Sequence, residues 1–283
     1  MNLAIGLVVL AAAMLHAVWN ALVKGAEDKV VILGLIAFGH VILGLLVIIS
    51  VPLPQVETIP YIMASTVIHW GYYYLLNTAY KLGDFSLMYP ISRGLAPVLI
   101  ALGSQFWIGE RLPVLAWAGI LTVSGGIMVL TGGLFSGSLS KSATVTAIGV
   151  AFSVTAYSLV DGVGIRISGN PLGYIGWLFV AEIFVVIFIL ASHWKCLFAV
   201  SGKTFVLGLA GGVISALAYA MVLYAKTTAP LGIISALRET SVIFATMIGV
   251  IWFKEGAAKR RLVAAVLVAG GIGIMAMAMA MAI

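Results

Sequence analysis

Long, nearly uncharged runs of apolar residues are the feature that most limits what this chain can fold into. A helix that crosses a bilayer needs about 20 mostly apolar residues, and ten such stretches follow one another along the 283 residues. Strands of a membrane barrel would be about 10 residues of alternating polarity. The continuous runs therefore predict an all-α membrane protein with ten transmembrane helices. The stretches are 3–23, 31–51, 60–80, 87–107, 113–131, 143–162, 171–192, 204–225, 231–253 and 262–281.

The shortage of charge excludes most other classes of protein. Only 8% of the residues are charged and 63% are apolar, whereas a soluble domain carries about 25% charged residues. Such a chain cannot cover a water-exposed surface, which excludes cytosolic enzymes, nucleic-acid-binding domains and disordered proteins. The first apolar run is longer than the core of a signal peptide, and no basic residue precedes it. We therefore expect it to stay in the protein as its first span.

An internal repeat relates the two halves of the chain. Arg93 aligns with Arg238, 145 positions later, and Glu110 aligns with Glu255 at the same offset. Each half would hold five spans, and an odd number makes the second half enter the membrane from the opposite side, as in many secondary transporters. The repeat predicts two inverted five-helix units, 1–138 and 139–283, with a substrate site at mid-depth between them. Further matches at this offset are Tyr74 with Tyr219, Lys81 with Lys226, and Trp107 with Trp252.

Short motifs in both halves carry a resemblance to a known family. Glu110 and Glu255 follow the fourth and ninth stretches, a glycine-rich stretch follows each, and the first span contains His16-Ala-Val-Trp19-Asn20. In these features the sequence resembles the drug/metabolite transporter superfamily, in its EamA branch. The resemblance implies a ten-helix permease and says almost nothing about its substrate. The second half has Gly164-Ile165 where the first has Trp19-Asn20, so a binding role for that pair would be one-sided.

Basic residues are divided unevenly between alternate loops. Ten lie on one side and three on the other, and the positive-inside rule places the ten-residue side in the cytoplasm, with both termini outside. The resembled family more often has both termini inside, so the two indications disagree. We expect an integral protein of the bacterial inner (plasma) membrane. The smaller set is Arg111, Arg166 and Lys226.

Ionisable residues inside the predicted spans are the candidates for function. A charge at the bilayer centre costs about 2.5–3.5 kcal/mol on insertion scales, so each one needs a partner or a task. Arg93 and Arg238 are related by the repeat, and the planar guanidinium suits carboxylate or phosphate. They form an anion-binding or gating pair, or they are neutralised by nearby acids: Arg93 by Asp161 or Glu182, and Arg238 by Glu239 or Glu182. The whole group is His16, His40, His69, Arg93, Asp161, Glu182, Arg238 and Glu239.

Other polar and aromatic residues share helical faces with these groups. His16, Trp19 and Asn20 lie at spacing i, i+3, i+4 on one face, and His16 aligns with Asp161 in the repeat. If these two meet, the pair could exchange a proton; otherwise His16 bonds a neighbouring helix. Two aromatic stripes run along 60–80, of which one lines a cavity and the other packs or lies at an interface. The predicted substrate-binding set is His16, Trp19, Asn20, Tyr74, Asn77, Arg93, Tyr157, Asp161, Glu182 and Arg238.

These features favour a secondary transporter that moves a small polar organic metabolite by alternating access. Arginines and acids inside the spans suit an amino-acid-like zwitterion or an organic anion. No Walker motif, HExxH motif or paired His/Cys ligand set is present, so we expect no ATP, metal or other cofactor. The expected partners are the solute, the lipid bilayer and a coupling proton, with a monomeric protein and no nucleic acid. The alternatives are a membrane enzyme using His16 and Asp161 as an acid–base pair, and a passive channel.

Two further features are assigned structural roles. Glu110 and Glu255 lie near helix ends, where we expect them to hold a turn or to pair with Arg111, Lys254 or Lys259. The small pairs Gly125-Gly126 and Gly270-Gly271 are expected to allow close helix packing.

Overall fold

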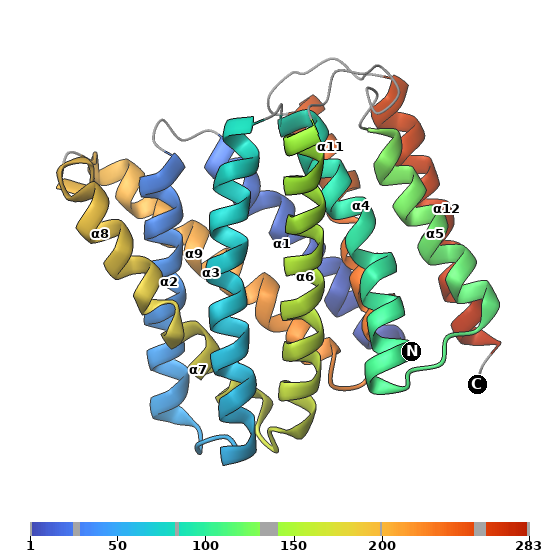
Figure 1. Ribbon diagram of the computed structural model, residues 1–283, viewed down its shortest axis with the longest axis horizontal. Coiled ribbons are helices and arrows are strands. Elements are labelled where there is room, and N and C mark those ends of the chain that lie inside the picture. The colour runs from blue at the N-terminus through green and yellow to red at the C-terminus, as the bar shows by residue number, and fades with distance from the viewer. Residues whose placement is uncertain are drawn as a thin grey trace.

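Helices form all the regular structure in the described part of the chain. The computed structural model describes residues 2–24, 29–82, 85–130, 141–198, 200–251 and 259–281. Figure 1 shows a single bundle in which the long helices run roughly up and down the molecule. The helices are α1 (Leu3–Lys24), α2 (Lys29–Ser50), η1 (Val56–Thr58), α3 (Ile59–Leu82), α4 (Phe85–Gly103), η2 (Ser104–Ile108), α5 (Val114–Val129), α6 (Lys141–Ile167), α7 (Pro171–Ala181), α8 (Ile183–Phe198), α9 (Gly202–Ala225), α10 (Leu231–Arg238), α11 (Ser241–Ile251) and α12 (Lys259–Ala280).

The prediction of an all-α membrane protein is confirmed. Within the described ranges, eight helical segments are long and apolar enough to cross a membrane. Two of the predicted spans, α3 and α5, fall short of that standard. The histidine, tryptophan and several tyrosines of α3 lower its mean hydropathy, and α5 has only 16 residues. The chain is therefore an integral membrane protein, and its apolar surface faces lipid.

Two spans are interrupted at a glutamate. A tight turn at Glu182 separates α7 from α8, and Glu239 and Thr240 separate α10 from α11. At each break the helical hydrogen bond shortens to the third residue back: the Glu182 amide donates to the Phe179 carbonyl at 3.1 Å, and the Glu239 amide donates to the Ala236 carbonyl at 3.1 Å. Tightened turns of this kind inside a helix often mark functional positions.

The helices pack in a pattern that brings distant parts of the sequence together. Helix α1 packs on α9 and α11, while α6 packs on α3 and α4; α2 packs on α7, and α5 packs on α12. In Figure 1, α1 begins and α12 ends at the lower end of the bundle. The connections 51–58, 109–113, 168–170 and 226–230 lie at that same end.

Small residues allow α5 and α12 to approach closely, as predicted, although only one glycine of each pair lies in the contact. A Cβ on Gly126 would lie 2.8 Å from the Leu267 Cβ, and one on Gly271 would lie 2.7 Å from the Gly119 carbonyl oxygen. Gly125 and Gly270 face open space. Adjacent residues on a helix point about 100° apart, so both members of a Gly-Gly pair cannot serve one interface.

Candidate functional site

A buried ion pair joins the two halves of the chain in the middle of their spans. Arg93 lies on α4 between Pro90 and Pro97, and Glu239 lies at the break between α10 and α11. The Arg93 Nη2 lies 2.7 Å from Glu239 Oε1, and Nε donates to Oε2 at 3.1 Å. The two side chains are 8% and 2% exposed. The predicted partners of Arg93, Asp161 and Glu182, are therefore wrong: the two-pronged guanidinium matches a carboxylate from a helix that α4 contacts directly.

Arg238 and His16 lie close to this ion pair. Arg238 is half-buried, and within the described part of the chain no ion pair joins it to Glu239, Glu182 or any other carboxylate. Helix α1, which carries His16, packs on α10 and α11, the two helices that flank Glu239. We call Arg93, Glu239, Arg238 and His16 the central cluster. It has two fixed positive charges and one carboxylate, so it carries an excess of positive charge.

The polar residues of α1 form hydrogen bonds with one another. Trp19 Nε1 donates to His16 Nδ1 at 3.2 Å, and Asn20 Nδ2 donates to the His16 carbonyl oxygen at 2.7 Å. The rings of His16 and Trp19 meet edge to face, with centroids 5.2 Å apart. The predicted common face of these three residues is thus present.

Asp161 is held by two tyrosines and not by histidine. Its side chain is fully buried, Tyr174 donates to Oδ1 at 3.0 Å, and Tyr219 donates to Oδ2. No contact between Asp161 and His16 occurs among the described residues. Of the two alternatives, the one in which Asp161 and His16 meet is therefore wrong, because α6 packs on α3 and α4 whereas α1 packs on α9 and α11.

The Asp161 carboxylate should depend on both phenols for its stability. We expect Tyr174→Phe to lower the free energy of unfolding by about 1–3 kcal/mol, since it removes one hydrogen bond to a buried charge. Tyr224→Phe, at a tyrosine that is 49% exposed, is the matched control and should change little. Thermal unfolding of the purified protein in detergent measures both. Equal melting temperatures for the two variants would contradict the assignment.

An aromatic layer formed by residues of α3, α6 and α9 lies next to Asp161. His69 stacks on Tyr157 with centroids 4.2 Å apart and meets the edge of Tyr219 at 6.2 Å. Tyr157, predicted to bind substrate, is 6% exposed and packs in this layer. Tyr74 is 73% exposed and points away from it, so its predicted place in an enclosed site is wrong. The Asn77 side chain lies outside the described part of the structure.

A contact between a histidine and a glutamate also links the two halves of the chain. His40 Nδ1 on α2 lies 3.0 Å from both oxygens of Glu182, at the break between α7 and α8. Only the contact to Oε1 has hydrogen-bond geometry, which leaves Oε2 buried without a hydrogen-bond partner. The side chains of His40 and Glu182 are 8% and 18% exposed. Glu182 therefore pairs with histidine and not with either arginine.

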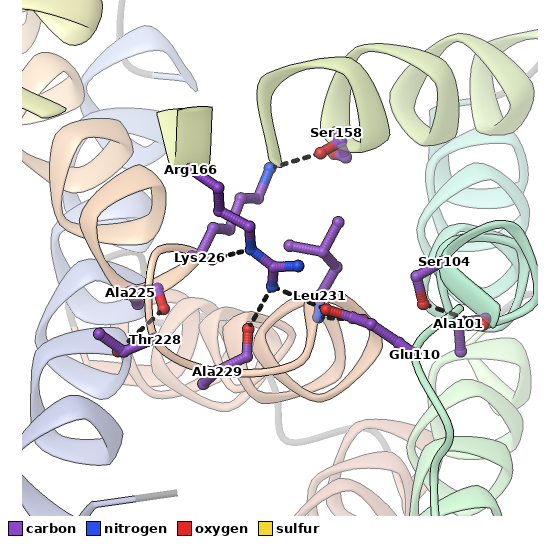
Figure 2. A network of polar contacts seen from close by, with 10 residues as sticks. All are labelled: Ala101, Ser104, Glu110, Ser158, Arg166, Ala225, Lys226, Thr228, Ala229 and Leu231. Carbon is purple, nitrogen blue, oxygen red and sulfur yellow. Dashed lines mark hydrogen bonds and ion pairs between the residues drawn. The ribbon is translucent and has the colours of Figure 1, made fainter. Parts of the chain in front are cut away.

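A charged network joins the end of α6, Glu110 and the 226–230 connection (Figure 2). Arg166, near the end of α6, donates through Nη2 to Glu110 Oε1 at 2.7 Å and to the Ala229 carbonyl at 2.9 Å, and through Nε to the Lys226 carbonyl at 2.7 Å. The other oxygen of Glu110 accepts the Leu231 amide at 2.9 Å, at the start of α10. Glu110 thus has the structural role predicted for it, with Arg166 as its partner in place of Arg111.

A left-handed glycine brings Glu110 into this network. Gly109 has φ +77°, a conformation that only glycine adopts at no cost, and it ends the π-helical turn η2. The chain then reverses, and the Glu110 carboxylate reaches the first amide of α10, where a negative charge is favourable. Glu255 and Lys254, which the prediction also named, lie outside the described ranges, and Lys259 is exposed at the start of α12.

Lys226, whose carbonyl oxygen belongs to this network, has a buried side chain. Its Nζ donates to the Ser158 carbonyl oxygen at 3.1 Å, and the side chain is 3% exposed. Burial lowers the pKa of Lys226 from 10.5 to about 8, although the nearby Asp161 favours the charged form. The ammonium is thus only weakly favoured above neutral pH.

This shift predicts a pH dependence of stability. Between the folded and unfolded pKa of Lys226 the unfolded state binds more protons, so this group's contribution to the free energy of unfolding rises with pH. From about pH 7 to about pH 9.5 the rise should be about 2 kcal/mol. Lys226→Met should remove it, whereas Lys203→Met, at an exposed lysine, should not. Thermal unfolding at the two pH values checks this, and an unchanged pH dependence in Lys226→Met would contradict it.

The predicted set omitted several residues that complete these clusters. Glu239 and His40 could have been included from the sequence, since both are ionisable residues within predicted spans. The sequence gave little indication that Tyr219 and Tyr174 bind Asp161, because tyrosine is common near membrane interfaces. Within the described residues, no group of three or more His, Cys, Asp or Glu side chains is placed to hold a metal ion.

Comparison with known proteins bears on the fold alone. No protein-family model matches the sequence, and no curated protein matches it. Among solved structures, one described as "Crystal structure of protein" superposes with a TM-score of 0.77 and covers 98% of this chain and 99% of its own. The two sequences are 19% identical. A shared helical architecture follows from this likeness, and a shared activity does not.

Proposed function

We propose that this protein is a secondary transporter that moves a small polar organic metabolite across the membrane by alternating access. The observation that carries the proposal is the buried pair of Arg93 and Glu239. Charges at the middle of a span are costly and mark substrate or ion pathways. This pair lies at a helix break and connects segments 146 residues apart, which is where two moving halves would meet.

The packing pattern supports ten spans arranged as two inverted halves, 1–138 and 139–283, with α3 and α5 counted as spans. Exchanging the halves turns the contact of α1 with α9 into that of α6 with α3, and the contact of α4 with α6 into that of α10 and α11 with α1. The contacts of α5 with α12 and of α2 with α7 map onto themselves. This is the pattern expected of inverted repeats in secondary transporters, including the resembled EamA branch.

The central cluster supports an anionic group on the substrate. Arg238 is half-buried beside His16 and makes no ion pair with a carboxylate in the described ranges. A guanidinium in that position suits a carboxylate of an organic anion or of an amino-acid-like zwitterion. We place the protein in a bacterial inner membrane as a monomer, with a proton as the coupling ion.

Counterflow in proteoliposomes tests the proposal. Vesicles loaded with a mixture of unlabelled amino acids and organic acids should accumulate a labelled member of the mixture transiently and saturably, in unmodified form. Empty vesicles and vesicles with the Arg238→Gln variant are the controls. Flux that does not saturate would indicate a channel, and a chemically altered solute would indicate an enzyme; either result would overturn the proposal. Dependence on an imposed pH gradient separately tests the proton.

A further inference from the structure

The break between α7 and α8 places a carboxylate in the middle of a membrane span. The two helices together form a span of 23 residues, Pro171–His193, and Glu182 is at its centre. The Glu182 side chain is 18% exposed, and its Oε2 is buried without a hydrogen-bond partner. Ionisable residues at this depth are costly, and they commonly belong to substrate, ion or proton pathways.

The His40 ring determines which member of this contact can take up a proton. His40 Nδ1 lies 3.0 Å from both Glu182 oxygens, and it must carry the hydrogen because a carboxylate only accepts hydrogen bonds. The other ring nitrogen, Nε2, is buried without a hydrogen-bond partner. A second proton on the ring would create a buried N–H with no acceptor, which is unfavourable. A proton on Glu182 instead removes a buried negative charge, so the carboxylate is the better acceptor.

A small space beside Glu182 admits a proton carrier and excludes a solute. Residues of α3, the α7–α8 break and α9 line this space, and its volume is about 10 Å³. That is room for about one water molecule. A water molecule there can pass a proton to the carboxylate, whereas an organic molecule does not fit.

The groups that surround Glu182 bring no fixed positive charge to it. No lysine or arginine is among the residues that line the space. Helix α6, which also packs on α7, contributes Asp161, whose two oxygens are held by tyrosines. One bound proton therefore makes Glu182 neutral, and no neighbouring cation competes with that proton. The titratable side chains that face Glu182 are His40 on α2, His69 and Tyr73 on α3, and Tyr219 on α9.

We propose that Glu182 is the site that binds the coupling proton, with His40 as its positioning residue. Their contact joins α2 in the first half to the α7–α8 break in the second, 142 residues away. Protonation of Glu182 weakens this contact, because hydrogen bonds to a charged group are stronger than those between neutral groups. The two halves can then separate here, which links proton uptake to their movement. The inference rests on the transport function proposed above and adds the place at which the proton acts.

Infrared difference spectroscopy of the purified full-length protein tests the proton site without a transport assay. Acidification from a mildly alkaline to a mildly acidic buffer should produce the C=O band of a protonated carboxyl group. Glu182→Gln should remove this band, whereas Glu57→Gln, at an exposed carboxylate on η1, should leave it in place. Identical bands in Glu182→Gln and in the parent protein would overturn the proposal.

Transport by the same variant separates coupling from solute movement. Glu182→Gln keeps the side chain neutral at every pH, so counterflow should persist while accumulation driven by a pH gradient falls at least about tenfold. Glu57→Gln should keep both activities. Gradient-driven accumulation at the parent level in Glu182→Gln would contradict the proposal. So would loss of counterflow in the folded variant, because Glu182 would then act on the solute.

A second variant decides if Glu182→Gln does not fold. His40→Gln removes the ring that positions the carboxylate, so it should shift the pH dependence of the carboxyl band and of uptake. His193→Gln, in the last part of α8, is its control and should shift neither. An unchanged pH dependence in His40→Gln would overturn the proposal. A parent protein that shows the carboxyl band but no counterflow would refute the transport function and leave the protonation of Glu182 established.

Discussion

Glu239→Gln should destabilise this protein by about 3–5 kcal/mol and abolish solute uptake. The substitution leaves the Arg93 guanidinium charged at mid-span without its carboxylate, and an uncompensated buried charge is far more costly than a neutral pair. Both groups are almost fully buried, at 8% and 2% exposed, so water cannot replace the lost partner. Thermal unfolding in detergent measures the first effect, and counterflow in proteoliposomes measures the second.

The double variant Arg93→Gln with Glu239→Gln separates stability from function. Removing both charges should restore most of the lost stability, because two neutral amides can bond each other. Uptake should stay absent, since the arginine that we place in the substrate pathway is gone. Glu57→Gln, at an exposed carboxylate, is the control for loss of charge alone. Wild-type uptake by the double variant would show that the pair is only structural.

Arg166→Gln should open the lower end of the bundle and lower the free energy of unfolding by about 2 kcal/mol. The guanidinium makes three hydrogen bonds there, to Glu110 and to the carbonyls of Lys226 and Ala229, and those to charged groups contribute most. Arg166 is 26% exposed, which keeps the expected cost below that of the Arg93 pair. Without the guanidinium, α6 and the 226–230 connection lose the group that holds them together.

Thiol accessibility reports the opening directly. Cys196 is the single cysteine, so Cys196→Ser gives a background for Ser158→Cys, at a position that is 4% exposed. A membrane-impermeant maleimide should label this cysteine slowly, and at least tenfold faster when Arg166→Gln is added. Arg111→Gln, at an exposed arginine, should not change the rate. Unchanged labelling in Arg166→Gln would show that the network does not close this end.

The membrane class and the candidate charges could be predicted from the sequence. Each of the ten apolar stretches contains helix. A continuous apolar segment that crosses lipid must satisfy its backbone hydrogen bonds within itself, and a helix does so. Buried charges could also be anticipated, because Arg93, Asp161 and Glu239 interrupt apolar runs, and all three are buried in the structure. Charged residues are rare inside apolar stretches, so they can be recognised from the sequence without knowledge of the fold.

Which groups pair with one another depended on the tertiary structure. Arg93 pairs with Glu239, His40 with Glu182, and Glu110 with Arg166. The two members of each pair are at least 56 residues apart in the sequence. Spacing along one helix tells which residues share a face, but it does not tell which neighbouring helix that face meets. Asp161 and His16 align with each other at an offset of 145 residues and yet lie on helices with different neighbours.

Side-chain direction was the other property that needed the fold. Tyr73 is partly buried and lies near Glu182 and Tyr219, while Tyr74 is 73% exposed, although the two are adjacent and identical in type. One residue turns a helix by about 100°, so an aromatic run on α3 supplies an inner and an outer stripe at once. The sequence by itself therefore determined that the chain spans a membrane and which charges must be buried. The packing of α3, α4 and α10 against their neighbours decided which stripe faces inward and which charges meet. Hydropathy is a property of each segment by itself, whereas an ion pair needs two helices that the fold brings together.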